Sequence, residues 1–75
     1  MKVNRKFQKL GTELKKARKK KRLSQSQAAR LLGYINPVSI SYIENGQHRI
    51  PLDKLATICK VYDVRIGELL DKIYN

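Results

Sequence analysis

Hydrophobic residues recur every three or four positions along most of this chain, which is the period of an amphipathic α-helix. No stretch alternates apolar and polar residues as a half-buried β-strand does. Five helical segments are expected, at about residues 5–21, 25–32, 37–45, 52–62 and 66–73. The pattern predicts an all-α fold, and 75 residues allow a single domain over positions 1–75.

The apolar stripe of each segment gives the residues expected in the core of this domain. The stripe steps by three and four positions in each of the longer segments. The expected core residues are Phe7, Leu10, Leu14, Ala17, Ala28, Leu31, Leu32, Ile40, Ile43, Leu52, Leu55, Ile58, Cys59, Tyr62, Leu69, Leu70 and Ile73. Cys59 lies within this stripe, so we expect it to be a packing residue.

Residues at the ends of the first two segments match the known signals for helix termini. Asn4 is a plausible N-cap for the first segment. Ser24 and Gln27 have the S-x-x-Q spacing of a capping box at the start of the second segment. Gly33 is expected to end that segment, because glycine adopts the left-handed conformation that stops a helix.

The third segment has its own start and stop signals. Asn36 is the predicted N-cap, with Pro37 at the first helical position. Ile35 before the cap and Ile40 after it are predicted to form a hydrophobic staple. The dipeptide Asn45-Gly46 is expected to end the helix in a left-handed turn.

The charge of the chain is strongly one-sided. Seventeen Lys and Arg face six Asp and Glu, which gives a formal net charge of +11. Seven of the eight residues 15–22 (KKARKKKR) are basic. Such a run is commonly a solvated helix face, but like charges this close repel one another. We therefore favour a polyanionic partner whose phosphates these residues contact.

Composition also excludes several classes of protein. One cysteine, Cys59, allows no intrachain disulfide, and with a single histidine, His48, it is too few for a structural zinc site. No apolar run is long enough for a membrane span, and no apolar stretch follows the basic N-terminus as in a signal peptide. There is no catalytic Ser/His/Asp set, paired acid site or glycine-rich phosphate loop. We expect a cytoplasmic protein that is not an enzyme and has no metal or cofactor.

Residues 25–46 have the pattern of a helix-turn-helix. This motif needs a small residue where its two helices touch and a glycine in the turn between them. It also needs branched apolar residues one turn apart that anchor the second helix while its other face stays exposed. Ala29, Gly33, Ile40 and Ile43 meet these demands.

Residues 10–70 resemble the Cro and phage-repressor type of helix-turn-helix domain, the lambda-repressor-like or Xre family. The resemblance rests on LGTELKKARKKKRLSQSQAARLLG, ISYIENG and PLDKLATICKVYDVRIGELL. It implies a compact five-helix domain that binds operator DNA, usually as a symmetric dimer. It also implies a dimer surface at the chain end, here around Ile66, Leu69, Ile73 and Tyr74.

The resemblance assigns an ion pair and a set of phosphate contacts. An Arg late in the first helix and a Glu at the end of the recognition helix form a pair in this family, here Arg18 and Glu44. Glu44 is the only acid between Glu13 and Asp53, which favours this role over a weak surface pair. The expected phosphate contacts are Lys19, Lys20, Arg22, Ser24, Gln25, Ser39, Asn45 and Arg49. The alternative for Gln25 is simple solvation at the start of its helix, and the alternative for Asn45 is a plain C-cap. His48 either contacts a phosphate or is exposed to solvent.

The recognition helix is expected at 37–45, and its outward side offers the candidate base-reading residues. These residues are Asn36, Pro37, Val38, Ser41 and Tyr42. None is Arg, Lys or Gln, so we expect readout biased to A·T pairs and partly based on DNA shape, with affinity supplied mainly by phosphates. The turn from Gly33 to Ile40 is one residue longer than is common in the family, so the register of base reading stays open by one place.

The favoured function is a sequence-specific, double-stranded DNA-binding regulator, acting as a repressor in a bacterial or phage setting. It would bind a pseudo-palindromic operator as a homodimer, without a membrane or a small-molecule effector domain. One alternative is a protein-interaction module on the same scaffold, such as an antitoxin-like partner. Another is a basic RNA-binding or membrane-surface segment, because the first helix is cationic and amphipathic.

Overall fold

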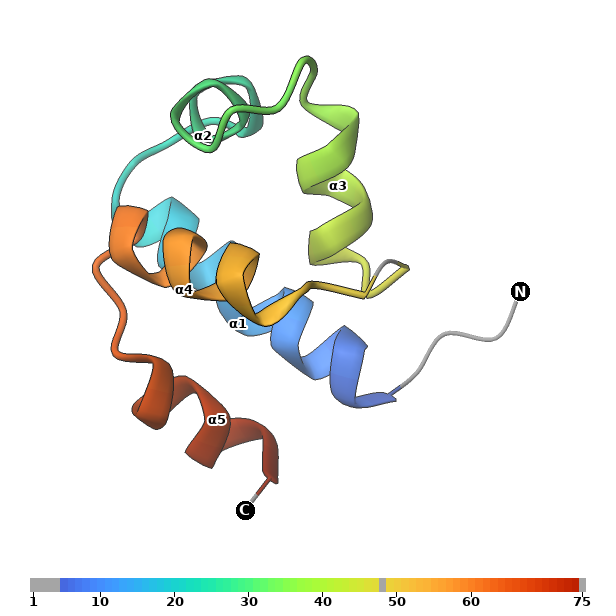
Figure 1. The fold of residues 1–75 in the computed structure, drawn as a ribbon, viewed down its shortest axis with the longest axis vertical. Helices are drawn as coiled ribbons and strands as arrows, with labels where there is room; N and C mark the ends of the chain where they lie inside the picture. Colours follow the sequence, from blue (N-terminus) through green and yellow to red (C-terminus); the bar gives the residue numbers. More distant parts are fainter. Residues whose placement is uncertain (1–4, 48, 75) are drawn as a thin grey trace.

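The computed structural model describes residues 5–47 and 49–74, and within them it contains five helices and no strand. The helices are α1 (Arg5–Lys20), α2 (Gln25–Leu31), α3 (Val38–Glu44), α4 (Leu52–Val61) and α5 (Ile66–Tyr74). The helices α2 and α3 lie together at one end of the molecule and α5 lies at the other, with α1 and α4 between them (Figure 1). The predicted all-α, five-helix fold is confirmed. Asn4 and His48 lie outside the described residues.

The capping box predicted for α2 is present. The backbone N–H of Gln27 donates to Ser24 Oγ at 3.0 Å, and the backbone N–H of Ser24 donates to Gln27 Oε1 at 2.8 Å. At the other end of α2, Gly33 has a φ of +80°, which a side chain would strain. Local sequence alone therefore determines both ends of this seven-residue helix.

The start of α3 lies one residue later than predicted. Pro37 has helical dihedrals but precedes the helix, and Asn36 Oδ1 accepts a hydrogen bond from the backbone N–H of Val38 at 3.0 Å. A staple needs apolar residues just before the cap and at the fourth helical position. In the observed register those positions are Asn36 and Ser41, so the predicted staple is wrong. Ile35 is fully exposed at 101%.

The core lies where all five helices meet, and most of the predicted stripe is in it. Its buried hydrophobic residues are Leu14, Ala28, Ala29, Leu32, Ile40, Ile43, Leu55, Ile58, Cys59, Tyr62, Leu69 and Ile73. Two predicted members are exposed, Leu31 at 59% and Leu52 at 72%. The buried arc of α2 runs through Ala28, Leu32 and Ala29, which leaves Leu31 outside it. Leu52 opens α4, whose first buried residue is Leu55.

The helices α1 and α3 approach each other at two glycines, Gly11 and Gly46. Gly46 has the left-handed φ of +72° expected of the helix stop, but the sequence did not predict that either glycine contacts the other helix. A Cβ atom at Gly11 would lie 2.5 Å from the carbonyl oxygens of Ile43 and Glu44. A Cβ atom at Gly46 would lie 2.6 Å from the backbone nitrogen of Gln8. Both distances are shorter than van der Waals contact, so only glycine lets the end of α3 rest against the backbone of α1.

Candidate nucleic-acid interface

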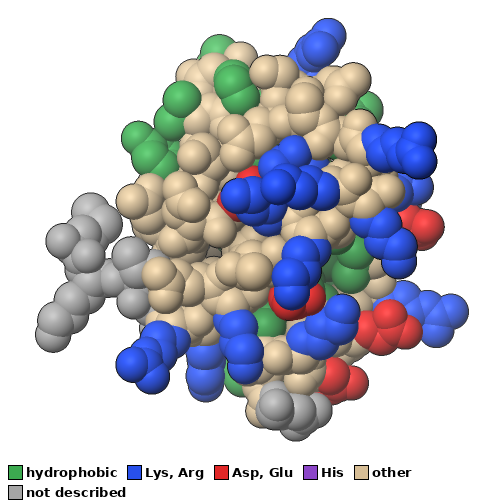
Figure 2. Space-filling view, turned by 180° about the vertical axis from the view of Figure 1, so that it is seen from behind, with side chains coloured by type: hydrophobic (Ala, Val, Ile, Leu, Met, Phe, Trp, Pro, Cys, Tyr) green, Lys and Arg blue, Asp and Glu red, His purple; other side chains and the backbone are tan. Residues whose placement is uncertain are grey.

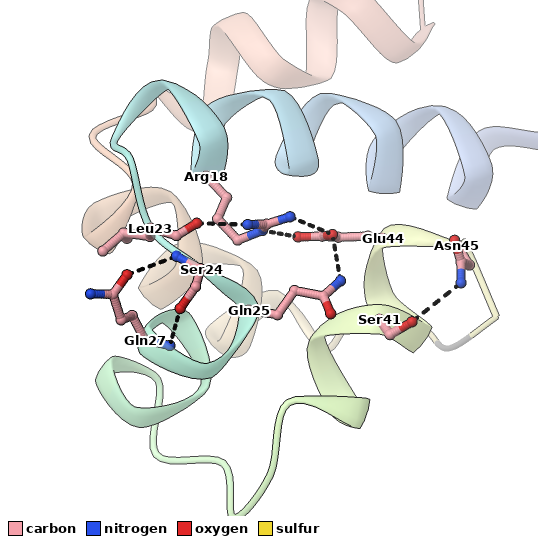
Figure 3. Close-up of polar contacts among 8 residues, drawn as sticks. All are labelled: Arg18, Leu23, Ser24, Gln25, Gln27, Ser41, Glu44 and Asn45. Atoms are coloured by element: carbon pink, nitrogen blue, oxygen red, sulfur yellow. Dashed lines mark hydrogen bonds and ion pairs between the residues drawn. The ribbon is translucent and has the colours of Figure 1, made fainter.

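Arg18 and Glu44 form a buried ion pair between α1 and the end of α3, as the sequence predicted (Figure 3). Arg18 Nε donates to Glu44 Oε2 at 2.6 Å, and Arg18 Nη2 donates to Glu44 Oε1 at 3.2 Å. Each residue is only 6% exposed. The third guanidinium nitrogen, Nη1, donates to the carbonyl oxygen of Leu23 at 2.6 Å.

Gln25 extends this pair to the second helix of the motif. Its Nε2 donates to Glu44 Oε1 at 3.1 Å, so one carboxylate accepts hydrogen bonds from both α1 and α2 (Figure 3). Among the described residues, no buried side-chain nitrogen or oxygen lacks a hydrogen-bond partner. A buried charge pair adds little net stability, but its bidentate geometry restricts how the joined helices are oriented. We call Arg18, Gln25 and Glu44 the anchor cluster.

With its inner side anchored, α3 presents an uncharged outer side. Val38 is 49% exposed and Tyr42 is 41% exposed, while Ile40 and Ile43 are buried. Ser41 lies between these sides and is half-buried, and its Oγ accepts from Asn45 Nδ2 at 3.4 Å. The only charged residue of α3, Glu44, is in the anchor cluster. The predicted helix-turn-helix arrangement, with a buried Ala29, a left-handed Gly33 and buried Ile40 and Ile43, is therefore confirmed.

The structure brings several of the candidate phosphate contacts close to α3. Ser24 is the N-cap of α2, and the next residue, Gln25, belongs to the anchor cluster. Asn45 follows the last residue of α3. Ser39 and Arg49 line one small depression at the side of α3, although ten residues separate them in the sequence. Gln25 and Asn45 therefore lie by the last residues of α3, and Ser39 and Arg49 lie along its side.

The basic run 15–22 is divided among different faces of the molecule. Arg18 is buried in the anchor cluster. Lys20 lines a depression between α1 and α5, together with Lys72 and Glu68. Lys20 is nine residues from Gly11, or about two and a half helical turns, so it lies on the side of α1 opposite to α3. Lys19 and Arg22 are exposed and are not among the residues that line this depression.

Three further cations lie beside the end of α3, and sequence reasoning missed them. Arg5, Lys6 and Lys9 line a shallow depression that Asn45 and Thr12 also border, and Lys6 Nζ also lies 4.6 Å from the centre of the Tyr74 ring. The spacing of four residues between Arg5 and Lys9 places these two on one face of α1. That spacing was visible in the sequence, but the proximity to Asn45 depends on the close packing at Gly46.

Charge and apolar character are separated on the surface. Lys and Arg side chains gather over the centre, right and bottom of the view in Figure 2. Hydrophobic side chains gather at its upper left edge, toward α3 and the link before it, with no Lys or Arg among them. Among the exposed large hydrophobic residues, Ile35, Val38 and Tyr42 belong to α3 and the link before it, and Leu31 is the last residue of α2. No helix among the described residues is long and apolar enough to cross a membrane.

This geometry defines a helix-turn-helix protein: two short helices joined by a glycine turn, the second anchored by buried residues and exposed on its other side. The comparison with protein families agrees. The helix-turn-helix model matches residues 14–69, and the chain belongs to this family, of the lambda-repressor-like type. No curated protein matches the sequence significantly.

Solved structures of gene regulators have the same fold. The clp gene regulator ClgR of C. glutamicum superposes with a TM-score of 0.84 at 19% identity, covering 96% of this chain and 91% of that one. The restriction-modification controller protein C.AhdI of Aeromonas hydrophila gives 0.75 at 28% identity, covering 84% and 94%. The controller protein C.Esp1396I, solved as a tetramer with its natural 35 base-pair operator, gives 0.76 at 22% identity, covering 96% and 99%.

Proposed function

We propose that this chain is a sequence-specific regulator of transcription that places α3 in the major groove of double-stranded DNA and represses by covering a promoter. The observation that carries this proposal is the anchor cluster. It joins α1, α2 and the end of α3 through hydrogen bonds of 2.6–3.2 Å, while Val38 and Tyr42 on the other side of α3 stay exposed. A fixed helix with an exposed outer side is the arrangement that groove reading requires.

In this proposal base reading and phosphate binding are carried out by different residues. Asn36, Pro37, Val38, Ser41 and Tyr42 face the base edges. The phosphate contacts are Lys19, Arg22, Ser24, Gln25, Ser39, Asn45 and Arg49, with Arg5 and Lys9 beside Asn45. Lys20 is left out of this set, because it lines the depression on the α5 side of α1. The net charge of +11 supports binding to a polyanion at low salt.

We further propose that two copies bind a pseudo-palindromic operator, so that their α3 helices lie one turn of DNA apart. Two of the four residues expected at the dimer surface are buried in this structure. Leu69 and Ile73 are 3% and 6% exposed, so they belong to the core and are not available for dimer contacts. Tyr74 is 61% exposed and Ile66 is half-buried, which supports these two as the contribution of α5.

We place the protein in the cytoplasm of a bacterium, on the nucleoid, with no enzymatic activity of its own. Two alternatives use the same surfaces differently. As an antitoxin-like module, the chain would use the apolar side of α3 for a protein partner. As a basic RNA or membrane-surface binder, it would use α1 alone. The exposed apolar residues Leu31, Ile35 and Val38 would suit a protein partner. Neither alternative, however, requires the hydrogen bonds that fix α3 against α1 and α2, so we favour the regulator.

Selection of bound duplexes from a random library tests the proposal. We expect enrichment of a pseudo-palindrome whose half-sites are about 10 base pairs apart, centre to centre. Tyr42→Ala should change the enriched sequence. Leu52→Ala, which removes an exposed side chain from α4, should leave it unchanged. Failure to enrich any duplex, or equally strong binding to anionic vesicles, would contradict the proposal.

A further inference from the structure

Ile35 is the most exposed large hydrophobic residue that the structure describes. It is 101% exposed in the link between α2 and α3, and its apolar neighbours in the motif, Leu31 and Val38, are 59% and 49% exposed. The hydrophobic edge in Figure 2 lies toward this end of the molecule and contains no Lys or Arg. An isoleucine in this position adds nothing to the core. Its side chain faces solvent, where it is accessible to another molecule.

The backbone on both sides of Ile35 is fixed by hydrogen bonds and packing. The N–H of Tyr34 donates to the carbonyl oxygen of Ala29 at 2.8 Å, and the Tyr34 ring packs against the core with Lys54 Nζ 4.9 Å from its centre. On the other side, Asn36 Oδ1 accepts a hydrogen bond from the backbone N–H of Val38 at 3.0 Å. The ring of Pro37 also restricts the φ angle of Pro37 itself. The side chain of Ile35 is therefore held outward at the entry to α3.

The chemistry of the neighbouring positions limits how this edge can read DNA. Pro37 has no N–H to donate, the oxygen of Asn36 is engaged with Val38, and α3 has no Arg, Lys or Gln. The side-chain nitrogen of Asn36 can still donate to a base, but Ile35 and the exposed Val38 offer only apolar contact. In the major groove the C5-methyl group of thymine is the apolar feature that a base pair presents.

We propose that Ile35 is a specificity-determining residue that packs against the C5-methyl group of one thymine in each operator half-site. The inference rests on the proposed function, because it needs α3 in the major groove. The group that Ile35 contacts is the methyl group of a 5-methylpyrimidine. Ile35 is continuous with the outer side of α3, where Val38 is exposed next to the link, so both side chains reach the same groove. Ile35 then recognises a methyl group rather than a hydrogen-bonding pattern.

The test uses the selected operator with thymines replaced one at a time by deoxyuridine, which removes only the methyl group. Dissociation constants are measured for the unaltered protein, for Ile35→Ala and for Leu52→Ala as the control. At one thymine per half-site we expect the unaltered protein and Leu52→Ala to lose about fourfold in affinity, the contribution of one buried methyl group. Ile35→Ala should bind the two duplexes alike.

A second arm restores the methyl group on a different base. At the same position, 5-methylcytosine should bind the unaltered protein more tightly than cytosine does, and Ile35→Ala should not distinguish them. The inference is overturned if no deoxyuridine replacement weakens binding, or if Ile35→Ala loses as much as the unaltered protein. Unchanged affinity of Ile35→Ala for the unmodified operator would also overturn it. Absence of any duplex binding would contradict the proposed function itself.

Discussion

Glu44 shows how one side chain can fix the position of a helix. Its carboxylate is 6% exposed and accepts hydrogen bonds from two nitrogens of Arg18 and from Gln25 Nε2. Removing one partner of a buried pair leaves the other charge in a low-dielectric environment without compensation, which costs much more than the pair contributes net. The anchor cluster therefore makes the end of α3 sensitive to single substitutions.

Glu44→Gln tests this at the level of stability. We expect a loss of about 3 kcal/mol in the free energy of unfolding, because Arg18 keeps its charge and loses its counter-charge. Urea denaturation measures the change. The matched control is Glu13→Gln, whose surface pairs with Lys16 and Lys72 at 3.3 and 3.5 Å should contribute at most about 1 kcal/mol. Equal effects of the two substitutions would contradict a special role for Glu44.

Tyr62 gives the fold a dependence on alkaline pH. Burial, with a smaller contribution from the negative charge of Glu44, raises the pKa of Tyr62 to about 12. A raised pKa means that the folded state keeps the proton more tightly than the unfolded chain does, so stability is complete below pH 10 and falls as pH rises through 10 to 12. The loss should be on the order of 2 kcal/mol. Tyr62→Phe should reduce this fall in denaturation midpoints measured across the same range, and an unchanged fall would refute the assignment.

At the scale of elements, close packing of α1 against α3 depends on the absence of a side chain at Gly11. The carbonyl oxygens of Ile43 and Glu44 leave no room for a Cβ atom, which would lie 2.5 Å from each. These atoms belong to backbone, so they can only yield if the whole end of α3 moves. The packing at Gly11 and the anchor cluster thus act on the same few residues.

Gly11→Ala should destabilise the protein by about 2–3 kcal/mol, as overpacking of a well-filled contact does, and should also weaken operator binding because α3 is displaced. Gly67→Ala is the matched control. Gly67 is also helical, but a Cβ atom there meets nothing within 4 Å, so alanine should stabilise by about 0.5 kcal/mol. Thermal unfolding and binding titrations of both variants give the comparison. A neutral Gly11→Ala would show that α3 adjusts without cost.

The elements that the sequence predicted well are those fixed by local chemistry. The capping box of Ser24 and Gln27, the stop at Gly33 and the period of the apolar stripes gave helix bounds within about one residue. The Arg18–Glu44 pair was predicted through family resemblance. The predicted staple at Ile35 was wrong because it depends on the register of one turn. The predicted burial of Leu31 was wrong because packing decides which edge of an apolar stripe is buried. The approach at Gly11 needed coordinates, since it joins residues far apart in the chain.

For the whole molecule, the position of each cation should matter more than the total charge. Each phosphate contact that is removed should lower the slope of log affinity against log salt by about one. We expect Lys19→Ala to show this decrease in binding titrations at several salt concentrations. Lys20→Ala removes the same charge one residue further along α1, on the side of the depression with Lys72, and should change the slope much less. Equal slopes for both variants would indicate a diffuse electrostatic field rather than discrete contacts.

The uncharged outer side of α3 has a consequence for behaviour in cells with changing ion content. The release of counter-ions from DNA depends on the cations elsewhere on the surface, which bind phosphates independently of the base sequence. The apolar contacts that distinguish one duplex from another involve no exchange of ions. A rise in potassium would shorten the residence of the protein on all DNA in proportion, yet the rank order of its target sites would stay the same.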